Sequence, residues 1–299
     1  MILVFGKGQL GQELAGRAEL AATSLVVLPR EAVDVTDRTA VANALARIPA
    51  DVVVNAAAYT AVDKAEKEPD LAWRVNVDGA ANIAAECARA GVPLIHLSTD
   101  YVFDGANGDA AYCEDNATNP LGVYGRTKLA GEIAVSQATP SHIILRTSWL
   151  YGRYGRNFLI TMLRLATERD RIPVVADQYG CPTSTEDLAE AILRAAAAAA
   201  ARASPWGTYH FAGQGTTTWH GFASQIVSEC NRRLGGQTKV VAIGTADYPV
   251  LARRPPNSVL SSAKFTRTFA FTARHWSAAS DATVAAVLSD GAMRSPAAA

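Results

Sequence analysis

The stretch ILVFGKGQLGQEL, residues 2–14, places a glycine-rich turn between an apolar run and a helical pattern. Residues 2–5 predict a buried β-strand, and we expect a helix from Gln9. Gly6, Gly8 and Gly11 form the pattern G-x-G-x-x-G, in which glycine permits a tight turn and a close backbone approach to a pyrophosphate. The helix N-terminus offers unpaired N–H groups to phosphate oxygens. The stretch therefore predicts the first βα unit of a dinucleotide-binding fold, with cofactor contacts from Gly6, Gly8, Gln9, Leu10 and Gly11.

The first half of the chain continues this alternation of strand and helix. Its apolar runs are continuous, which is typical of parallel strands buried on both faces. We therefore expect an α/β fold of the Rossmann type, with a doubly wound parallel sheet. The further strands are predicted at 24–28, 51–57, 92–98 and 142–148, and helices at 70–90, 120–137, 157–169, 185–203 and 218–234.

The order of elements becomes less regular after about residue 150. RIPVVADQYGCPTS and GTYHFAGQGTTTWHGF read as short strands with turn-rich loops. We predict a dinucleotide-binding Rossmann domain at 1–150 and a smaller substrate-binding lobe at 151–299, partly interleaved with the first. The closing RSPAAA, 294–299, is expected to be frayed.

Composition excludes several classes of protein. The 28 basic and 28 acidic residues cancel, which argues against nucleic acid or an anionic membrane as the main partner. The four cysteines lie far apart and without metal-ligand spacing, so we expect free thiols in a reducing compartment and no metal site. The opening apolar run is too short for a signal peptide, and arginines interrupt the alanine-rich stretch 191–203. A cytoplasmic protein is expected.

The end of the second predicted strand indicates which nicotinamide cofactor is used. An acid there accepts from the ribose 2′-hydroxyl of NAD, whereas an arginine suits the 2′-phosphate of NADP. This chain has Pro29 followed by Arg30, which favours NADPH over NADH. Asp34 and Val35 are further candidates for cofactor contact. Two alternatives stay open: Arg30 as a solvated loop residue, and Asp34 as the cap of a helix that starts near Thr36.

Small side chains follow the third predicted strand. Residues 56–58 are all alanine, which leaves room for a dinucleotide at the sheet edge, although close strand–helix packing also requires alanine. We predict cofactor contacts from Ala57, Ala58, Tyr59 and Thr60. The charged residues that follow are interpreted as surface charges or a local ion pair: Asp63, Lys64 and Glu66.

The fourth predicted strand ends in LSTDYVF, so Thr99 and Asp100 lie at its carboxyl end, where ligands of open α/β sheets bind. Tyr124 and Lys128 follow in a predicted helix, one turn apart on the same face. A tyrosine hydroxyl has an ordinary pKa of about 10, and a neighbouring ammonium lowers it. We therefore predict Tyr124 as the catalytic acid, Lys128 as the residue that tunes it, and Thr99 as a hydroxyl that meets a substrate oxygen.

These motifs resemble the extended short-chain dehydrogenase/reductases. The matching stretches are the glycine turn, NAAAYTAVDKAE, LSTDYVF, the Tyr–Lys pair, RTSWLYG and DQYGCPTS, in order along nearly the whole chain. Within that group the chain is most similar to the branch that reduces 4-keto-6-deoxy sugars attached to dTDP. The match extends from Gly6 to about residue 265.

The resemblance implies a mechanism and a set of site residues. NADPH would deliver hydride to C4 of the sugar, and Tyr124 would protonate the resulting oxyanion. Lys128 would hold the nicotinamide ribose, and Thr99 would hydrogen-bond the reacting oxygen. The implied substrate contacts are Asp100 and Trp149 at the sugar, Asn157 and Phe158 at the nucleotide, and Arg254 at the diphosphate. The alternative that Trp149 is only a core residue stays open.

Two points qualify the resemblance. One member of the family carries an acid at the end of its second strand, where this chain has Pro29 and Arg30, so dual use of NADH is less favoured. Some members bind Mg²⁺ at a dimer interface, and Glu186 matches an acidic position in that region. One carboxylate does not make a metal site, so we expect no catalytic metal. A homodimer is one option for the assembly.

Three alternatives to a reductase stay open. A nucleotide-sugar 4,6-dehydratase needs an acid after Thr99 and Asp100, and Tyr101 at that position disfavours it. A 4-epimerase would run the same hydride transfer twice and keep NAD bound. A non-catalytic regulatory subunit, of the kind known for methionine adenosyltransferase, would bind a dinucleotide without sugar chemistry. The complete set of Thr99, Tyr124 and Lys128 argues against that subunit.

Overall fold

The computed structural model describes residues 1–202 and 206–289 of the chain. Its centre is a six-stranded sheet in the order β10-β5-β4-β3-β1-β2, and each neighbouring pair is parallel. The predicted α/β fold with a doubly wound parallel sheet is therefore confirmed. The strands are β1 (Ile2–Phe5), β2 (Leu25–Leu28), β3 (Val52–Asn55), β4 (Leu94–Thr99), β5 (His142–Thr147) and β10 (Gly207–His210). Ala203, the predicted end of one helix, and the segment expected to be frayed lie outside the described residues.

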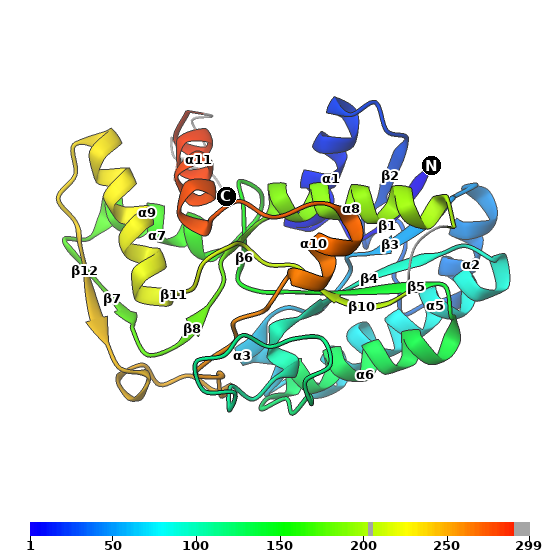
Figure 1. Ribbon diagram of the computed structural model, residues 1–299, viewed down its shortest axis with the longest axis horizontal. Helices are drawn as coiled ribbons and strands as arrows, with labels where there is room; N and C mark the ends of the chain where they lie inside the picture. Colours follow the sequence, from blue (N-terminus) through cyan, green and yellow to red (C-terminus); the bar gives the residue numbers. More distant parts are fainter. Residues whose placement is uncertain (203–205, 290–299) are drawn as a thin grey trace.

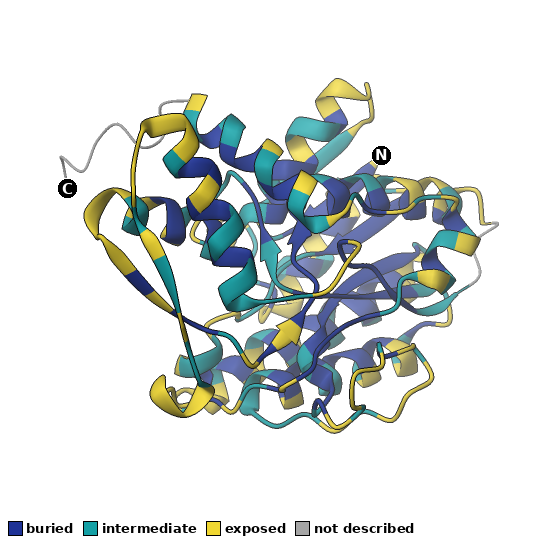
Figure 2. Ribbon diagram, turned by 60° about the vertical axis from the view of Figure 1, so that its left-hand side comes forward, coloured by how far each residue is buried: buried dark blue, intermediate teal, exposed yellow. Residues whose placement is uncertain are grey.

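Helices cover both faces of this sheet (Figure 1). Leu3, Val4 and Phe5 of β1 are each fully buried although they alternate between the faces, which explains the continuous apolar run. Figure 2 shows the strands as the buried interior between exposed helix surfaces. One face packs against α1 (Gln9–Leu20), α8 (Thr185–Ala200) and α10 (Ala263–Phe269), and the other against α2 (Arg38–Arg47), α5 (Gly79–Ala90) and α6 (Val123–Ala138).

A second hydrophobic core lies beside the sheet, at the left of Figure 1. Three helices enclose it: α7 (Phe158–Glu168), α9 (Trp219–Leu234) and α11 (Trp276–Ser289). The parallel strands β7 (Arg171–Val175) and β12 (Lys239–Ile243) complete it. Short strand pairs connect it to the main sheet: β6 (Leu150–Tyr151) with β9 (Thr183–Ser184), and β8 (Tyr179–Gly180) with β11 (Thr217–Thr218).

Short helical segments differ from the sequence-based expectations. The helix expected at 70–90 consists of α4 (Pro69–Trp73), a π-helical turn η1 (Arg74–Asp78) and α5. The helix expected near Thr36 begins at Arg38, and Asp37 rather than Asp34 accepts the N-terminal amide bonds that cap it. The remaining segments are α3 (Val62–Ala65) and the 3₁₀ turns η2 (Asp100–Val102) and η3 (Thr245–Asp247).

Two further observations concern the chain as a whole. Cys87, Cys113, Cys181 and Cys230 are all free thiols. Within residues 1–202 and 206–289, each helix is too short or too polar to span a bilayer.

Candidate active site

The glycine turn between β1 and α1 has the backbone that the motif predicts. Gly6 has a φ of +104°, and a Cβ there would lie 2.7 Å from the backbone nitrogen of Ala57. A side chain at Gly11 would collide with the carbonyl oxygen of Gly6. Gly8 instead faces open space, and α1 has neither a side-chain cap nor an acidic residue in its first turn. This open, uncapped helix N-terminus fits the pyrophosphate of a dinucleotide.

The loop after β2 presents an exposed cationic group. The Arg30 side chain is 70% exposed, and its guanidinium lies 3.5 Å from the Asp34 carboxylate. Asp34 accepts hydrogen bonds from the amide and the hydroxyl of Thr36, and the amide bond is the main reason why its pKa is lowered. Val35 is buried beneath the loop, where its side chain would contact a Cβ on Gly79. Arg30 and Asp34 are therefore accessible to a cofactor, whereas Val35 supports the loop.

The loop after β3 is fixed by a residue that the sequence analysis did not select. The side chain of Asn76, in the π-helical turn, accepts from the amide of Tyr59 and donates to its carbonyl, and also donates to Thr127 of α6. Ala57 and Ala58 are half-buried beside the glycine turn, and Thr60 is exposed. The available signal for this role was an asparagine between two valines, Val75 and Val77, in the predicted helix.

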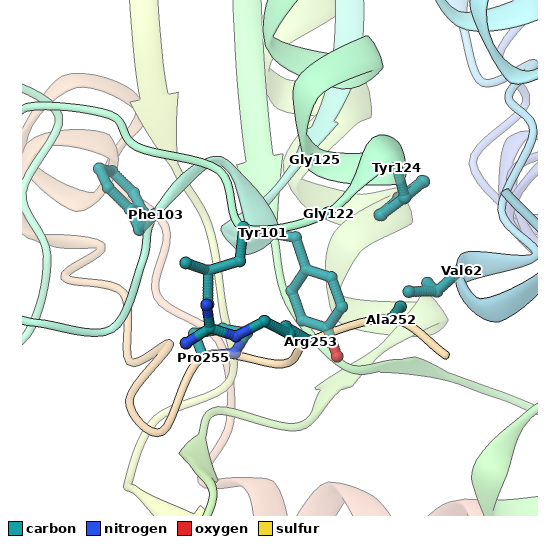
Figure 3. A pocket seen from close by; sticks show the side chains of 10 residues that line it. Val62, Tyr101, Phe103, Gly122, Tyr124, Gly125, Ala252, Arg253 and Pro255 are labelled. Carbon is teal, nitrogen blue, oxygen red and sulfur yellow. The ribbon is translucent and has the colours of Figure 1, made fainter. Parts of the chain in front are cut away.

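The predicted catalytic residues meet at the carboxyl end of β4. The hydroxyl of Tyr124 contacts that of Thr99, and Thr99 donates to the Asp100 carboxylate at 2.9 Å. Lys128 lies one turn further along α6, is buried, and donates from Nζ to the carbonyl oxygen of Leu97 at 2.6 Å. Figure 3 shows the ring of Tyr101 between the start of α6 and the segment that carries Arg253.

The pKa of Tyr124 differs from the sequence-based expectation. We expected Lys128 to lower it, but burial raises the pKa of Tyr124 to about 12, against a smaller opposing effect of the Thr99 hydroxyl. Burial also lowers the pKa of Lys128 to about 8, although the Glu132 carboxylate raises it. The expectation failed because a motif shows neighbours but not desolvation. Tyr124 is a neutral phenol at pH 7, the form that can donate a proton.

Asp100 is an unusual carboxylic acid at the centre of the site. It is 2% exposed, and its Oδ2 has no hydrogen-bond partner among the described residues. Burial raises the pKa of Asp100 to about 7, although hydrogen bonds from Ser258 and Thr99 act in the opposite direction. An unpaired buried oxygen costs free energy unless a ligand pairs with it. Asp100 is therefore suited to accept from a substrate hydroxyl.

A buried ion pair lies behind Lys128. Arg146 on β5 donates two hydrogen bonds to the Glu132 carboxylate, at 2.9 Å and 2.7 Å, and Ser98 donates to the same group at 2.5 Å. Both charged side chains are almost fully buried, so each would be costly without the other. Glu132 is one turn beyond Lys128 on α6. The pair supports the catalytic helix, and sequence analysis did not detect it because Arg146 comes from another element.

An aromatic cluster and a cavity lie beside the second hydrophobic core. The Trp149 ring stacks on the Trp219 ring with centroids 3.6 Å apart, and the ring centroids of Phe158 and Trp219 lie 4.7 Å apart. Trp149 has a φ of +46°, which bulky residues rarely adopt. Phe158, Trp219 and Arg254 line a cavity of about 320 Å³, a size that suits a small ligand.

Asn157 lies outside the lining of that cavity. Its side chain accepts from the amide of Ile160, which caps α7, and donates to the carbonyl of Gly152 at 2.8 Å. It also approaches Gln9 of the glycine turn at 3.4 Å. Asn157 therefore joins the lobe to the predicted cofactor turn and fixes the start of the helix that carries Phe158.

Two of the residues interpreted as surface charges or a local ion pair, Asp63 and Glu66, pair instead with groups far away in the chain. Asp63 accepts from Arg254 at 2.9 Å and from the amide of Ala252. Glu66 accepts from the amide of Val123, the first residue of α6, at 2.7 Å. Both are carried by the same short segment after β3. The NAAAYTAVDKAE motif contained them, but the sequence did not reveal these distant partners.

Glu186, the acidic residue considered for Mg²⁺ in the sequence analysis, does not fit a divalent cation. The Glu186 carboxylate lies 2.8 Å from Arg274 and 3.4 Å from Arg17, so two guanidinium groups already neutralise it. Burial raises the pKa of the neighbouring Glu13, which reduces its tendency to be an anionic ligand. No cluster of three or more metal-ligating side chains occurs in the described part of the chain.

A Rossmann sheet, an open glycine turn and a Tyr–Lys pair define the chain as an oxidoreductase of the short-chain dehydrogenase/reductase type. Comparison with known proteins makes this more specific. Residues 1–289 match the family described as RmlD substrate binding domain. A dTDP-4-dehydrorhamnose reductase from Sinorhizobium fredii is 45% identical over 293 residues, which is 97% of this chain and 98% of that protein.

Solved structures agree with this comparison. The dTDP-4-dehydrorhamnose reductase of Clostridium acetobutylicum has a TM-score of 0.88 and 35% identity, and covers 96% of this chain and 99% of its own. That of Bacillus anthracis, solved in complex with NADP, has a TM-score of 0.88 and 32% identity, and covers 95% of this chain and 98% of its own. The chain belongs to the dTDP-4-dehydrorhamnose reductase family.

Proposed function

We propose that the protein reduces the C4 keto group of dTDP-4-dehydro-β-L-rhamnose to a hydroxyl, giving dTDP-L-rhamnose, with NADPH as the reductant. Family membership supports the reaction. The contact between the hydroxyls of Tyr124 and Thr99, at the strand end that faces the glycine turn, is the observation that carries the proposal. Bound NADPH supplies the hydride, and the chain supplies the binding surfaces and the proton.

Tyr124 acts as the acid. As charge develops on the carbonyl oxygen, the Tyr124 O–H bond breaks, the proton moves to that oxygen, and a phenolate remains. A pKa of about 12 keeps the phenol protonated at neutral pH, and an alkoxide is basic enough to take its proton. Lys128, charged and adjacent on α6, stabilises the phenolate electrostatically once its contact with Leu97 is shared with the cofactor ribose.

The sugar nucleotide occupies the other half of the site. With substrate bound, the Thr99 hydroxyl turns from Asp100 and donates to the reacting oxygen, and the unpaired Oδ2 of Asp100 accepts from a sugar hydroxyl. Trp149, which stacks on Trp219 of the cavity lining, packs against the sugar. Phe158 lies against the nucleotide, and Arg254 pairs with the diphosphate. Asn157 assists the nucleotide indirectly, through the start of α7.

The cofactor contacts follow the same division. The backbone of Gly6, Gly8, Gln9, Leu10 and Gly11 holds the pyrophosphate, and Ala57, Ala58, Tyr59 and Thr60 line the approach to the nicotinamide. Asp34 borders the adenosine, and the buried Val35 supports the loop beneath it. The exposed guanidinium of Arg30 pairs with the 2′-phosphate, which favours NADPH over NADH.

Domain division, location and assembly are proposed on separate grounds. The distinct core around α7, α9 and α11 supports a substrate lobe after about residue 150. The four free thiols support a reducing, cytoplasmic location. A homodimer is proposed from family resemblance alone.

The test is NADPH oxidation, followed by absorbance, with purified protein and dTDP-4-dehydro-β-L-rhamnose beside Tyr124→Phe. We expect one NADPH consumed per sugar, and a kcat lowered about a thousandfold in the variant with NADPH affinity unchanged. Tight NADPH binding without turnover by the wild type would reject the reductase and favour a regulatory subunit. Turnover of the sugar without net loss of NADPH would indicate an epimerase.

A further inference from the structure

The short helix α3 and its C-cap residue contact both halves of the site. Asp63 of α3 and Glu66, the C-cap residue, lie three residues apart and share one face. Glu66 contacts the start of α6, which carries Tyr124. Asp63 contacts the segment that carries Arg254, 191 residues away in the chain. Since α3 directly follows the cofactor loop after β3, one element touches three parts of the predicted site.

Glu66 defines the first turn of the catalytic helix. The N-cap residue of α6 is Gly122, which has no side chain to accept the free amides. The Glu66 carboxylate accepts from Val123 instead, and its Oε1 would lie 2.7 Å from a Cβ on Gly122. The next residue is Tyr124. A carboxylate at a helix N-terminus also interacts favourably with the helix dipole.

Asp63 holds both the backbone and the side chain of the opposite segment. Its Oδ1 accepts from the amide of Ala252 at 3.2 Å, and its Oδ2 accepts from Arg254 at 2.9 Å. The Asp63 and Arg254 side chains are 39% and 24% exposed. Because such partly exposed pairs contribute little to stability, the main consequence of the pair is the direction in which the guanidinium points.

We propose that Asp63 and Glu66 are positioning residues that set the spacing between the proton donor Tyr124 and the cation Arg254. The inference rests on the proposed function, in which Arg254 binds the diphosphate. Asp63 acts on substrate binding through Arg254, and Glu66 acts on proton transfer through the start of α6. Loss of Asp63 should therefore change KM, whereas loss of Glu66 should change kcat.

The experiment compares alanine and isosteric variants at both positions. Asp63→Ala is expected to raise the KM for the sugar nucleotide and the Kd for dTDP about tenfold, with kcat within about twofold. Glu66→Ala is expected to lower kcat about tenfold with the Kd for dTDP unchanged. Glu66→Gln keeps a carbonyl acceptor and restores most of kcat, and Asp63→Asn gives an intermediate KM. Lys64→Ala, an exposed change on the same helix, is the matched control and should alter neither constant.

A double-mutant cycle with Arg254→Ala decides whether Asp63 acts through Arg254. The expected result is that Asp63→Ala adds nothing to the Kd for dTDP once Arg254 is alanine. Full additivity, or an unchanged Kd in Asp63→Ala beside a raised one in Arg254→Ala, would overturn the inference and leave the proposed function intact. An unchanged Kd in Arg254→Ala would overturn both the diphosphate assignment and the Asp63 inference. Equal loss of kcat in Glu66→Gln and Glu66→Ala would overturn the Glu66 inference.

Discussion

The two halves of the site are built in different ways. The cofactor half is one short stretch, in which the φ of Gly6 and the close approach of Gly11 to its carbonyl fix the turn locally. The half that we propose for the sugar nucleotide is assembled from distant residues, among them Phe158, Trp219 and Arg254. A local turn is recognisable as a motif, whereas an assembled cavity depends on the entire fold. The halves should therefore respond differently to substitution.

Gly6→Ala should have the largest effect and should affect the cofactor half alone. A Cβ would meet the Ala57 backbone at 2.7 Å, and φ is +104°. We expect NADPH affinity to fall at least about a hundredfold, measured by fluorescence titration, with dTDP affinity unchanged. Gly91→Ala is the control, because Gly91 also has a positive φ, +66°, but a Cβ there would meet no atom within 4 Å. It should lower stability by about 1 kcal/mol without affecting NADPH. Equal losses of both ligands in Gly6→Ala would mean that the halves are not independent.

The pH dependence of the unfolding free energy tests the role of Asp100, at the junction between the two halves. Its folded-state pKa of about 7 exceeds its ordinary value of 3.8, so its contribution to stability is complete below pH 4 and is lost as pH rises through 7. Between pH 5 and pH 7 we expect the wild type to lose about 2 kcal/mol of unfolding free energy relative to Asp100→Asn. Denaturant unfolding of both proteins at the two pH values measures this. If the wild type and Asp100→Asn changed equally in unfolding free energy between the two pH values, Asp100 would be ionised throughout.

Trp219→Ala should affect the sugar-nucleotide half alone. It removes the surface on which Trp149 stacks at 3.6 Å. We expect the KM for the sugar nucleotide to rise about tenfold, with NADPH affinity unchanged, in steady-state kinetics. Trp73→Ala, an exposed tryptophan on α4, is the matched control. A KM that does not move would assign the stack to folding rather than to the substrate.

Arg30→Ala should have the smallest effect and should sharpen the description of the cofactor half. Its guanidinium is 70% exposed, so solvent screens its interaction with a 2′-phosphate. We expect the ratio of kcat/KM for NADPH to that for NADH to fall about fivefold. This change corresponds to about 1 kcal/mol, which is less than a typical charged hydrogen bond contributes. Kinetics with both cofactors measures it. An unchanged ratio would make Arg30 a solvated loop residue.

The sequence predicted the fold because the first strands of the sheet are apolar runs that alternate with helical patterns. It did not predict β10 as a strand of this sheet, because its sequence GTYH is not an apolar run. It did not predict the π-helical turn at 74–78, because an inserted residue leaves no periodic signature. Tyr124, Lys128 and Thr99 could be selected by motif and strand position. The partners of Asp63 and Glu66 could not, since they lie 191 and 57 residues away. The pKa of Tyr124 was expected to fall because burial is not visible in a motif.

Strand β10 has a consequence for how the chain folds during synthesis. It comes from residues 207–210 yet pairs in parallel with β5, which carries Arg146, and His210 lies 3.4 Å from that guanidinium. A nascent chain of 150 residues therefore has an open sheet edge beside a buried charge, a state prone to aggregation. The sheet is complete only after residue 210 has left the ribosome. The glycine turn is thus among the first residues made, whereas the sheet to which it belongs is completed late in translation.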